Sequence, residues 1–266
     1  MDLTALRNVQ PNRACWMHPQ SSDQIKMIKN ALNEKESQQQ FLAQVGATIL
    51  DRSDFITLGH PNDVEGTILN ACLSVVRDIA DLKNIKVHCF SSYVTVTWLP
   101  PFCADPSANL PEHIARCDFI LLPSWATNHW MICIMKPKSR EMYLLDSLYG
   151  TDFSDCRFIG PYRKLAQQLH PGPWKEYGRD DLKGAPRQNC SNNCGVFVLM
   201  YTLYVVMGGL FDFAESDMAA VRRWWCLLLL TNYPVKSDAE RKLLRKRRKE
   251  MKTGITLTKI GLQQLI

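Results

Sequence analysis

Apolar runs alternate with short polar segments along most of the chain, and their spacing predicts both helices and strands. Residues 21–45 are polar, with apolar positions near the helical period, and predict a surface helix packed as an arm on the main domain. Residues 47–58 contain short strand-like pieces that end at a Gly-His-Pro-Asn-Asp turn. Asn62 or Asp63 can then cap a helix that continues to about Ile79.

The middle of the chain carries short apolar runs typical of β-strands, separated by polar gaps such as the turn Lys-Pro-Lys-Ser-Arg-Glu. Several runs are continuous rather than alternating, which predicts strands covered on both faces. The predicted strands are 86–90, 118–123, 129–135 and 142–147, followed by helices at about 161–169, 194–207 and 216–231. The pattern therefore predicts an α+β domain with a central sheet and a C-terminal cluster of helices.

The net charge of +6 is confined to one segment near the C-terminus. Residues 236–252 hold nine Lys/Arg and three Asp/Glu, whereas the rest of the chain holds 23 of each sign. The body of the protein therefore shows no charge bias towards nucleic acid, and only the helix-prone basic tail offers a weak contact of that kind. Such runs also serve as nuclear-import signals, so a nuclear location is favoured over a cytoplasmic one.

Two features place the protein inside the cell as a non-membrane protein. The ten cysteines show no paired framework, and the Met-Asp-Leu-Thr start resembles no signal peptide, so we expect reduced thiols. Residues 195–211 carry no charge, but the run is short for a bilayer span and is interrupted by Gly208 and Gly209. This run is therefore interpreted as a buried core helix.

Cys194 begins that apolar run and is followed directly by Gly195. A thiol attacks a carbonyl as its thiolate, and because an unperturbed cysteine has a pKa of about 8.5, a nucleophilic cysteine needs a helix N-terminus or a histidine beside it. Cys194 lies at the positive end of its predicted helix. Gly195 leaves the next backbone N–H unobstructed, which suits an oxyanion hole.

The histidine that this chemistry needs is expected to be His129, which opens a strand-like run beside Trp130. The other histidines are His18, His60, His88, His113 and His170. Asp146 ends the next strand-like run, and antiparallel pairing brings the start of one strand beside the end of the other. An Asp–His pair orients the imidazole and stabilises its charged form. Gln188, six residues before Cys194, can donate a second hydrogen bond to an oxyanion.

Each of these residues also has an ordinary structural interpretation. Cys190 is interpreted as a small core residue, and Asp146 could be a turn residue. Cys190 and Cys194 lack a second pair at ligand spacing, so no metal site is predicted. The ordered set of four residues, rather than any single one, favours thiol catalysis.

That ordered set resembles the Ulp/SENP proteases, which process SUMO and related ubiquitin-like modifiers, and more distantly the adenovirus-type proteases. The residues that carry the resemblance are His-Trp, then Asp-Ser after a hairpin, then Gln six residues before Cys-Gly. The resemblance covers about residues 47–230, because 54–58 is similar to the family's opening segment and 217–230 to its late Asp-Met…Arg-Arg helix. It implies a papain-like α+β fold with a central mixed sheet flanked by helices. The implied division is an N-terminal helical arm at 1–46, a catalytic protease domain at 47–235 and a basic C-terminal tail at 236–266.

The resemblance also implies roles. Cys194 is the expected nucleophile, His129 the general base and acid, Asp146 the residue that orients His129, and Gln188 an oxyanion donor. The expected substrate-binding residues are Trp130 and Gly195, with Trp130 lining a narrow channel for a Gly-Gly tail. Only glycine lets a substrate backbone pass between such close walls.

The sequence departs from the family pattern at two places. The family usually carries Asp before the catalytic cysteine, where this chain has Asn193. The family's Trp-Leu-Asn-Asp segment, whose tryptophan roofs the channel, is missing, and the nearest stretch is His-Pro-Asn-Asp at 60–63.

The expected activity is cleavage after the C-terminal Gly-Gly of SUMO, ubiquitin or another ubiquitin-like protein and its conjugates, with no cofactor. One alternative is an acetyltransferase with the same site; those enzymes often carry Glu as the acid, so Asp146 favours the protease. The other is a modifier-binding module without turnover, and the intact set of four residues argues against it.

Overall fold

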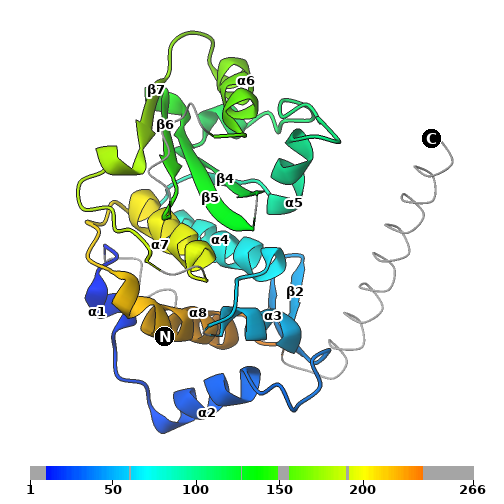
Figure 1. Ribbon diagram of the computed structural model, residues 1–266, viewed down its shortest axis with the longest axis vertical. Helices are drawn as coiled ribbons and strands as arrows, with labels where there is room; N and C mark the ends of the chain where they lie inside the picture. The colour runs from blue at the N-terminus through cyan, green and yellow to red at the C-terminus, as the bar shows by residue number, and fades with distance from the viewer. Residues whose placement is uncertain (1–9, 60, 127, 149–155, 190–191, 236–266) are drawn as a thin grey trace, which may run out of the picture.

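A five-stranded mixed sheet separates two groups of helices in the computed structural model of this protein (Figure 1). The structure describes residues 10–59, 61–126, 128–148, 156–189 and 192–235. The strands are β3 (Val87–Cys89), β4 (Phe119–Ala126), β5 (His129–Lys136), β6 (Glu141–Leu145) and β7 (Lys175–Gly178), in that spatial order. The central pairs β4–β5 and β5–β6 are antiparallel, whereas β3–β4 and β6–β7 are parallel. The predicted α+β fold with a mixed sheet is confirmed, and β7 is a strand that the pattern did not predict.

Both faces of the sheet are buried, as the continuous apolar strands predicted. Side chains alternate along a strand, so Leu121 and Ile134 face one core while Leu122 and Met135 face the other. The first core contains α4 (Gly66–Asp81) and α7 (Cys194–Met207), and the second contains α6 (Ile159–Leu169).

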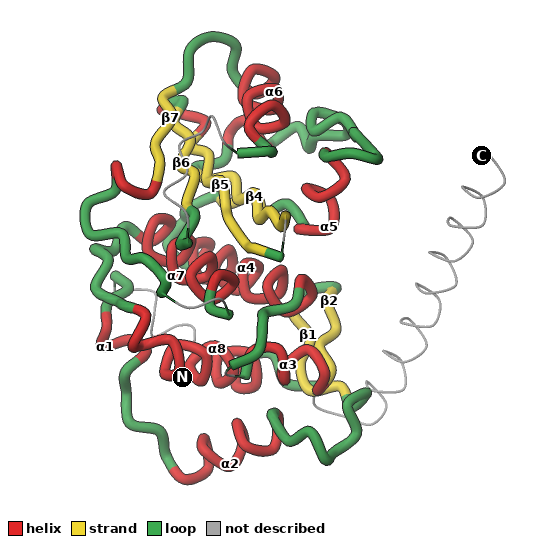
Figure 2. The backbone as a smooth tube through the Cα atoms, viewed as in Figure 1, coloured by secondary structure: helices red, strands yellow, loops and turns green. Residues whose placement is uncertain are grey.

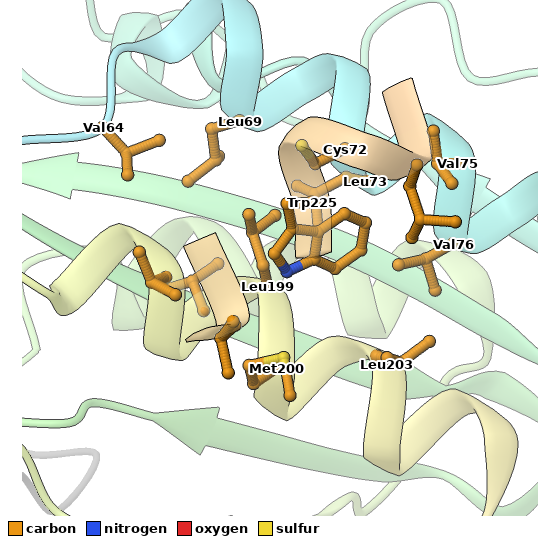
Figure 3. Close-up of a cluster of buried hydrophobic side chains, with 14 of the residues drawn as sticks. Val64, Leu69, Cys72, Leu73, Val75, Val76, Leu199, Met200, Leu203 and Trp225 are labelled. Carbon is orange, nitrogen blue, oxygen red and sulfur yellow. The ribbon is translucent and has the colours of Figure 1, made fainter. Parts of the chain in front are cut away.

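The helix α7 lies at the centre of the molecule, between the sheet, α4 and α8 (Met218–Asn232) (Figure 1). It is apolar on every side because every side is covered, and all but one of its residues are buried. Trp225 of α8 inserts its ring among side chains of α4 and α7, including Leu73 and Leu199 (Figure 3). The helix ends at Met207 with Gly208 in the left-handed conformation at φ 69°, so the predicted core helix is confirmed.

The segment before the sheet differs from the prediction at several places. The helix expected over 21–45 is α2 (Ser22–Ala31) only, because Phe41–Val45 forms β1, which pairs with β2 (Thr48–Asp51) (Figure 2). Residues expected as a strand form α3 (Arg52–Leu58) instead, because the side chains of Asp51 and Asp54 cap each other's backbone N–H groups.

The start of α4 also differs, since neither Asn62 nor Asp63 caps it. Glu65 occupies the N-cap position, and the side chain of Asn62 donates instead to the carbonyl of Ile56. The helix itself continues to Asp81, close to the predicted end.

The shorter elements connect these layers and hold the N-terminal residues in place. They are α1 (Arg13–Trp16), α5 (Ser92–Thr95), η2 (Val96–Trp98), η3 (Ile114–Arg116), η4 (Pro137–Ser139), η5 (Arg179–Asp181) and η6 (Glu215–Asp217). Trp16 is buried and donates from Nε1 to the Tyr204 hydroxyl at 3.0 Å, while Arg13 pairs with Asp217, so α1 is fixed to the rest of the fold. The predicted charged helix of the tail, Cys190 and His60 lie outside the described residues. Within the described ranges, no helix combines the length and the apolar character that a membrane span requires.

Candidate active site

Cys194 is the first residue of α7, as the sequence predicted, and only 3% of it is exposed. Its position at the N-terminus of a 14-residue helix gives the sulfur the positive end of the helix dipole. Gly195 is required by close packing here. A Cβ on it would lie 2.7 Å from Cβ of Val64 and 3.2 Å from Cδ1 of Trp130. The glycine therefore brings the start of α7 against the wall that contains Val64 and Trp130.

His129 and Asp146 lie together, as the predicted antiparallel hairpin requires. The register Ile132↔Leu145 places the start of β5 next to the residue that follows β6. Nε2 of His129 and Oδ1 of Asp146 are 2.7 Å apart, and both side chains are buried. The turn between the strands is η4, where the Lys-Pro-Lys-Ser-Arg-Glu turn was predicted.

The environment of His129 favours its charged form. Burial of the ring lowers the pKa of His129, but hydrogen bonds to Asp146 and to Cys194, and the charges of these two groups, raise the pKa from 6.5 to about 9. The ring is therefore an imidazolium at neutral pH, held between a carboxylate and a thiol. A histidine beside the cysteine sulfur is the arrangement that the predicted thiol chemistry requires.

Asp146 is held by hydrogen bonds to both its side chain and its backbone carbonyl. Its Oδ1 also accepts from the N–H of Leu148 at 2.9 Å, and its carbonyl accepts from Nη1 of Arg179 at 2.7 Å. Arg179 is itself buried and belongs to η5, which follows the edge strand β7. Sequence reasoning missed Arg179, because nothing in its local sequence indicates that it contacts the end of β6.

Gln188 is buried and is tied to the end of β6. Its Oε1 accepts from the Ser147 hydroxyl at 2.5 Å, and its backbone N–H donates to the Ser147 carbonyl at 3.0 Å. The amide oxygen thus serves Ser147, so the oxyanion role predicted for Gln188 falls to its Nε2 hydrogens. Ser147, directly after Asp146, is a second positioning residue that sequence reasoning missed.

A cavity of about 600 Å³ opens beside Cys194. Trp130 lines it and is held by a 2.8 Å hydrogen bond from its Nε1 to the carbonyl of Val64. Two exposed aromatic side chains, Tyr93 and Trp125, also line it, and Trp125 lies opposite Trp130 in the β4–β5 register. The remaining lining residues are Asp63, Val64, Glu65, Gly66, Ser92, Val96 and Asn128. A cavity of this size is in the usual range of ligand-binding pockets.

No metal centre accompanies this site in the described residues. Within them, no three His, Cys, Asp or Glu side chains gather in a group that could hold an ion. The fold brings the His129 imidazole to the Asp146 carboxylate and the Cys194 thiol, and it places the Gln188 amide on Ser147, next to Asp146.

Comparison with known proteins identifies relatives in sequence and in fold. The chain is similar to the human Sentrin-specific protease 3, with 25% identity over 183 residues that cover 66% of this chain and 30% of the relative. Two solved structures share the fold. The C-terminal Ulp1 protease domain, solved in complex with Smt3, the yeast ortholog of SUMO, superposes with a TM-score of 0.64 at 18% identity over 81% of this chain and 97% of that one. The Ulp1-like SUMO protease catalytic domain of Chaetomium thermophilum superposes with a TM-score of 0.68 at 20% identity, over 83% of this chain and 93% of that one.

The match is to a catalytic domain rather than to whole relatives. The chain spans less than two thirds of the length of the first curated relatives it matches. The model of the Ulp1 protease family, C-terminal catalytic domain, matches residues 64–231, which is more than half of the chain and includes His129, Asp146, Gln188 and Cys194. The chain therefore belongs to the Ulp1 protease family.

Proposed function

We propose that this protein is a cysteine peptidase and isopeptidase that cleaves after the C-terminal Gly-Gly of SUMO or a related ubiquitin-like modifier. The observation that carries the proposal is the position of His129, hydrogen-bonded to both Asp146 and Cys194 with its pKa raised to about 9. Family membership supports the same chemistry, and two relatives in the family are described as SUMO proteases or SUMO complexes.

In the first half of the reaction, the Cys194 thiolate attacks the scissile carbonyl and a C–S bond forms. The oxyanion accepts hydrogen bonds from Nε2 of Gln188 and from backbone N–H groups at the start of α7. His129 gives its proton to the leaving amine as the C–N bond breaks, which leaves a thioester on Cys194 and a neutral imidazole.

In the second half, the neutral imidazole of His129 accepts a proton from water as the water attacks the thioester. The C–S bond breaks, the modifier leaves with a free carboxylate, and the thiolate–imidazolium pair is restored. Asp146 keeps the ring oriented through both halves and stabilises its charged form.

Trp130 is proposed to form one wall of the passage for the Gly-Gly tail. Its Nε1 bond to Val64 fixes the indole beside Cys194, and Gly195 allows the close approach. The segment at 63–66 lines the same cavity without the tryptophan that the family usually carries there, so Tyr93 and Trp125 are the aromatic residues at its rim.

A modifier with an electrophilic C-terminus tests the proposal directly. SUMO and ubiquitin probes of this kind should label the wild-type protein at Cys194, and Cys194→Ala should abolish both labelling and cleavage. Cys190→Ser and Cys103→Ser serve as controls and should leave both unchanged. Labelling that follows Cys190 would contradict the assignment, and transfer of an acetyl group from acetyl-CoA without proteolysis would favour the acetyltransferase.

We propose further that the basic tail directs this protein to the nucleus. The support is the confinement of the net charge to residues 236–252. Replacing Arg245, Lys246, Arg247 and Arg248 with Ala should shift a fluorescent fusion towards the cytoplasm and leave cleavage unchanged. An unchanged distribution would remove the targeting role.

A further inference from the structure

A buried polar network lies directly behind Cys194 and is centred on Asn193, which is 1% exposed. Oδ1 of Asn193 accepts from Arg222 of α8, at 2.9 Å from Nη2 and 3.2 Å from Nε. Nδ2 of the same amide donates to Oε1 of Glu215 in η6. The neutral amide of Asn193 therefore lies between the buried guanidinium of Arg222 and the carboxylate of Glu215 and hydrogen-bonds to both.

The network holds the backbone ahead of Cys194 at two described residues, Asn189 and Asn192. Oε2 of Glu215 accepts from the backbone N–H of Asn189 at 3.2 Å, so one carboxylate binds residues on either side of the loop. Nη2 of Arg222 donates to the carbonyl of Asn192 at 2.6 Å. Asn189 is thus tied to η6 and Asn192 to α8.

Arg222 also connects this loop to the opposite wall of the cavity. Its Nη1 donates to the carbonyls of Gly59 at 3.1 Å and Leu58 at 3.3 Å, where α3 ends. The chain continues from there to Val64, whose carbonyl holds Trp130. A single buried cation therefore links the loop that precedes the nucleophile with the segment that leads to the substrate wall.

The charge arrangement explains why Asn is required at position 193. An aspartate could accept both bonds from Arg222, but its second oxygen would then face Oε1 of Glu215 within hydrogen-bond distance. Two carboxylates in contact repel each other while both are ionised, and each raises the pKa of the other. The amide at 193 and the carboxylate at 215 are therefore a matched pair.

We propose that Asn193, Glu215 and Arg222 position the described residues on either side of the nucleophile loop, Gln188–Asn189 and Asn192–Cys194, for oxyanion stabilisation, with Glu215 supplying the negative charge of the network. These three are positioning residues, since they act through the loop and contact no reacting atom. The inference rests on the proposed peptidase activity of Cys194.

Restoring the aspartate provides the test. Asn193→Asp should lower kcat about 10–100-fold, because a misplaced donor costs a reaction about that much, and should change KM little. Glu215→Gln alone removes one acceptor, for the N–H of Asn189, and should cost about 3–10-fold. The double variant should recover kcat to within about threefold of wild type, because Gln at 215 can donate to Asp at 193 and accept from Asn189.

The pH profile separates this role from general damage to the fold. Protonation of one carboxylate restores the missing hydrogen bond, so the kcat of Asn193→Asp relative to wild type should rise as pH falls from about 8 to about 5.5. The double variant has no carboxylate pair and should show a flat ratio over the same range.

Alkylation of Cys194 by iodoacetamide, followed by mass spectrometry, needs no oxyanion hole. Its rate should stay within about threefold of wild type in all three variants. Ser216→Ala, an exposed neighbour of Glu215, is the matched control and should match wild type throughout. If wild type alkylates at Cys194 but cleaves no modifier, the proposed function fails rather than the network.

Two results would overturn the inference. One is a wild-type kcat for Asn193→Asp across the pH range, and the other is a double variant no better than Asn193→Asp. If Asn193→Asp does not fold, Glu215→Ala decides, because Glu215 is half-buried in a short 3-10 turn and its truncation leaves the core intact. An unchanged kcat in Glu215→Ala would then refute the positioning role.

Discussion

Replacing Asp146 with Asn should cost this protein both stability and turnover, and the structure gives the scale of each. The pKa of His129 is raised from 6.5 to about 9, with Asp146 the first-ranked of the two partners that raise it. A shift of that size corresponds to roughly 3 kcal/mol of extra stability for the charged ring in the folded state. Asp146→Asn removes the larger share of this stabilisation of the charged His129 ring, because an amide carries no charge and can present a donor to Nε2 of His129.

The effect on turnover follows from the population of the imidazolium. With a pKa of about 9, about 97% of His129 is charged at pH 7.5, whereas at a pKa of 6.5 only about 9% would be. The loss of the charged imidazolium therefore accounts for up to about tenfold in turnover, and loss of the ring's orientation adds to it. The same substitution in a serine-protease triad costs about 10⁴ in turnover, so we expect between about 10² and 10⁴ here.

The sign of the pH dependence makes the prediction specific. Because the folded pKa of His129 is raised, its stabilising contribution is fully present below pH 6.5 and is lost as pH rises towards about 9. Thermal unfolding should therefore show a gap in Tm between wild type and Asp146→Asn at about pH 6 that shrinks by about pH 9.5. In parallel, kcat/KM on a fluorogenic SUMO or ubiquitin substrate should lose its alkaline limb at a lower pH in the variant.

Asp105→Asn is the matched control, since Asp105 is an exposed aspartate paired with Lys164 of α6. It should leave turnover and the pH profile unchanged. A Tm gap for Asp146→Asn that stays constant from pH 6 to 9.5, or near-normal turnover at neutral pH, would refute the reasoning. Either result would mean that another acid orients His129, or that none does.

Three further predictions concern the oxyanion donor, the close packing at the helix start and the substrate tail. Gln188→Ala should lower kcat about 10²–10³-fold and leave KM nearly unchanged in steady-state assays, whereas an effect on KM alone would indicate a substrate contact. Gly195→Ala should lower Tm and abolish labelling by modifier probes, because its Cβ would lie 2.7 Å from Cβ of Val64. Gly160→Ala is the control and should change neither, because no atom lies within 4 Å of the new methyl group. Replacing the penultimate Gly of SUMO or ubiquitin with Ala should strongly reduce cleavage, because the added Cβ would meet the indole of Trp130. Efficient cleavage of Ala-Gly tails would contradict a narrow passage. Equal cleavage of SUMO and ubiquitin with their Gly-Gly tails intact would show that the protein does not discriminate strictly between modifiers.

Local sequence determined much of this protein because several of its signals depend on neighbours along the chain. The all-apolar run from Cys194 predicted a fully buried helix, and the left-handed Gly208 ends it as a glycine can. The hairpin of β5 and β6 was readable from two apolar runs with a Pro-containing turn, and antiparallel pairing then placed His129 beside Asp146. Order and spacing along the chain were thus enough to predict that the Cys194 thiol, the His129 imidazole and the Asp146 carboxylate lie together.

Local signals failed where two of them competed. Residues 52–58 have a strand-like composition, yet the reciprocal caps of Asp51 and Asp54 make them a helix, because two satisfied N–H groups outweigh a weak strand preference. Residues 41–45 look helical in isolation but pair as β1 with β2 and contact the end of α8. Strand pairing depends on a partner, and the pattern of one segment does not contain it.

Only the tertiary structure decided how the site is supported. Arg179, Glu215 and Arg222 are ordinary charged residues in the sequence, and their contacts arise because the fold places them against Asp146 and Asn193. The change from Asp to Asn before the cysteine has no meaning in the local sequence, since its counterpart lies 22 residues away in η6. A buried charge must find its partners in space rather than along the chain, so hydrogen bonds of this kind become visible only when distant segments are packed together.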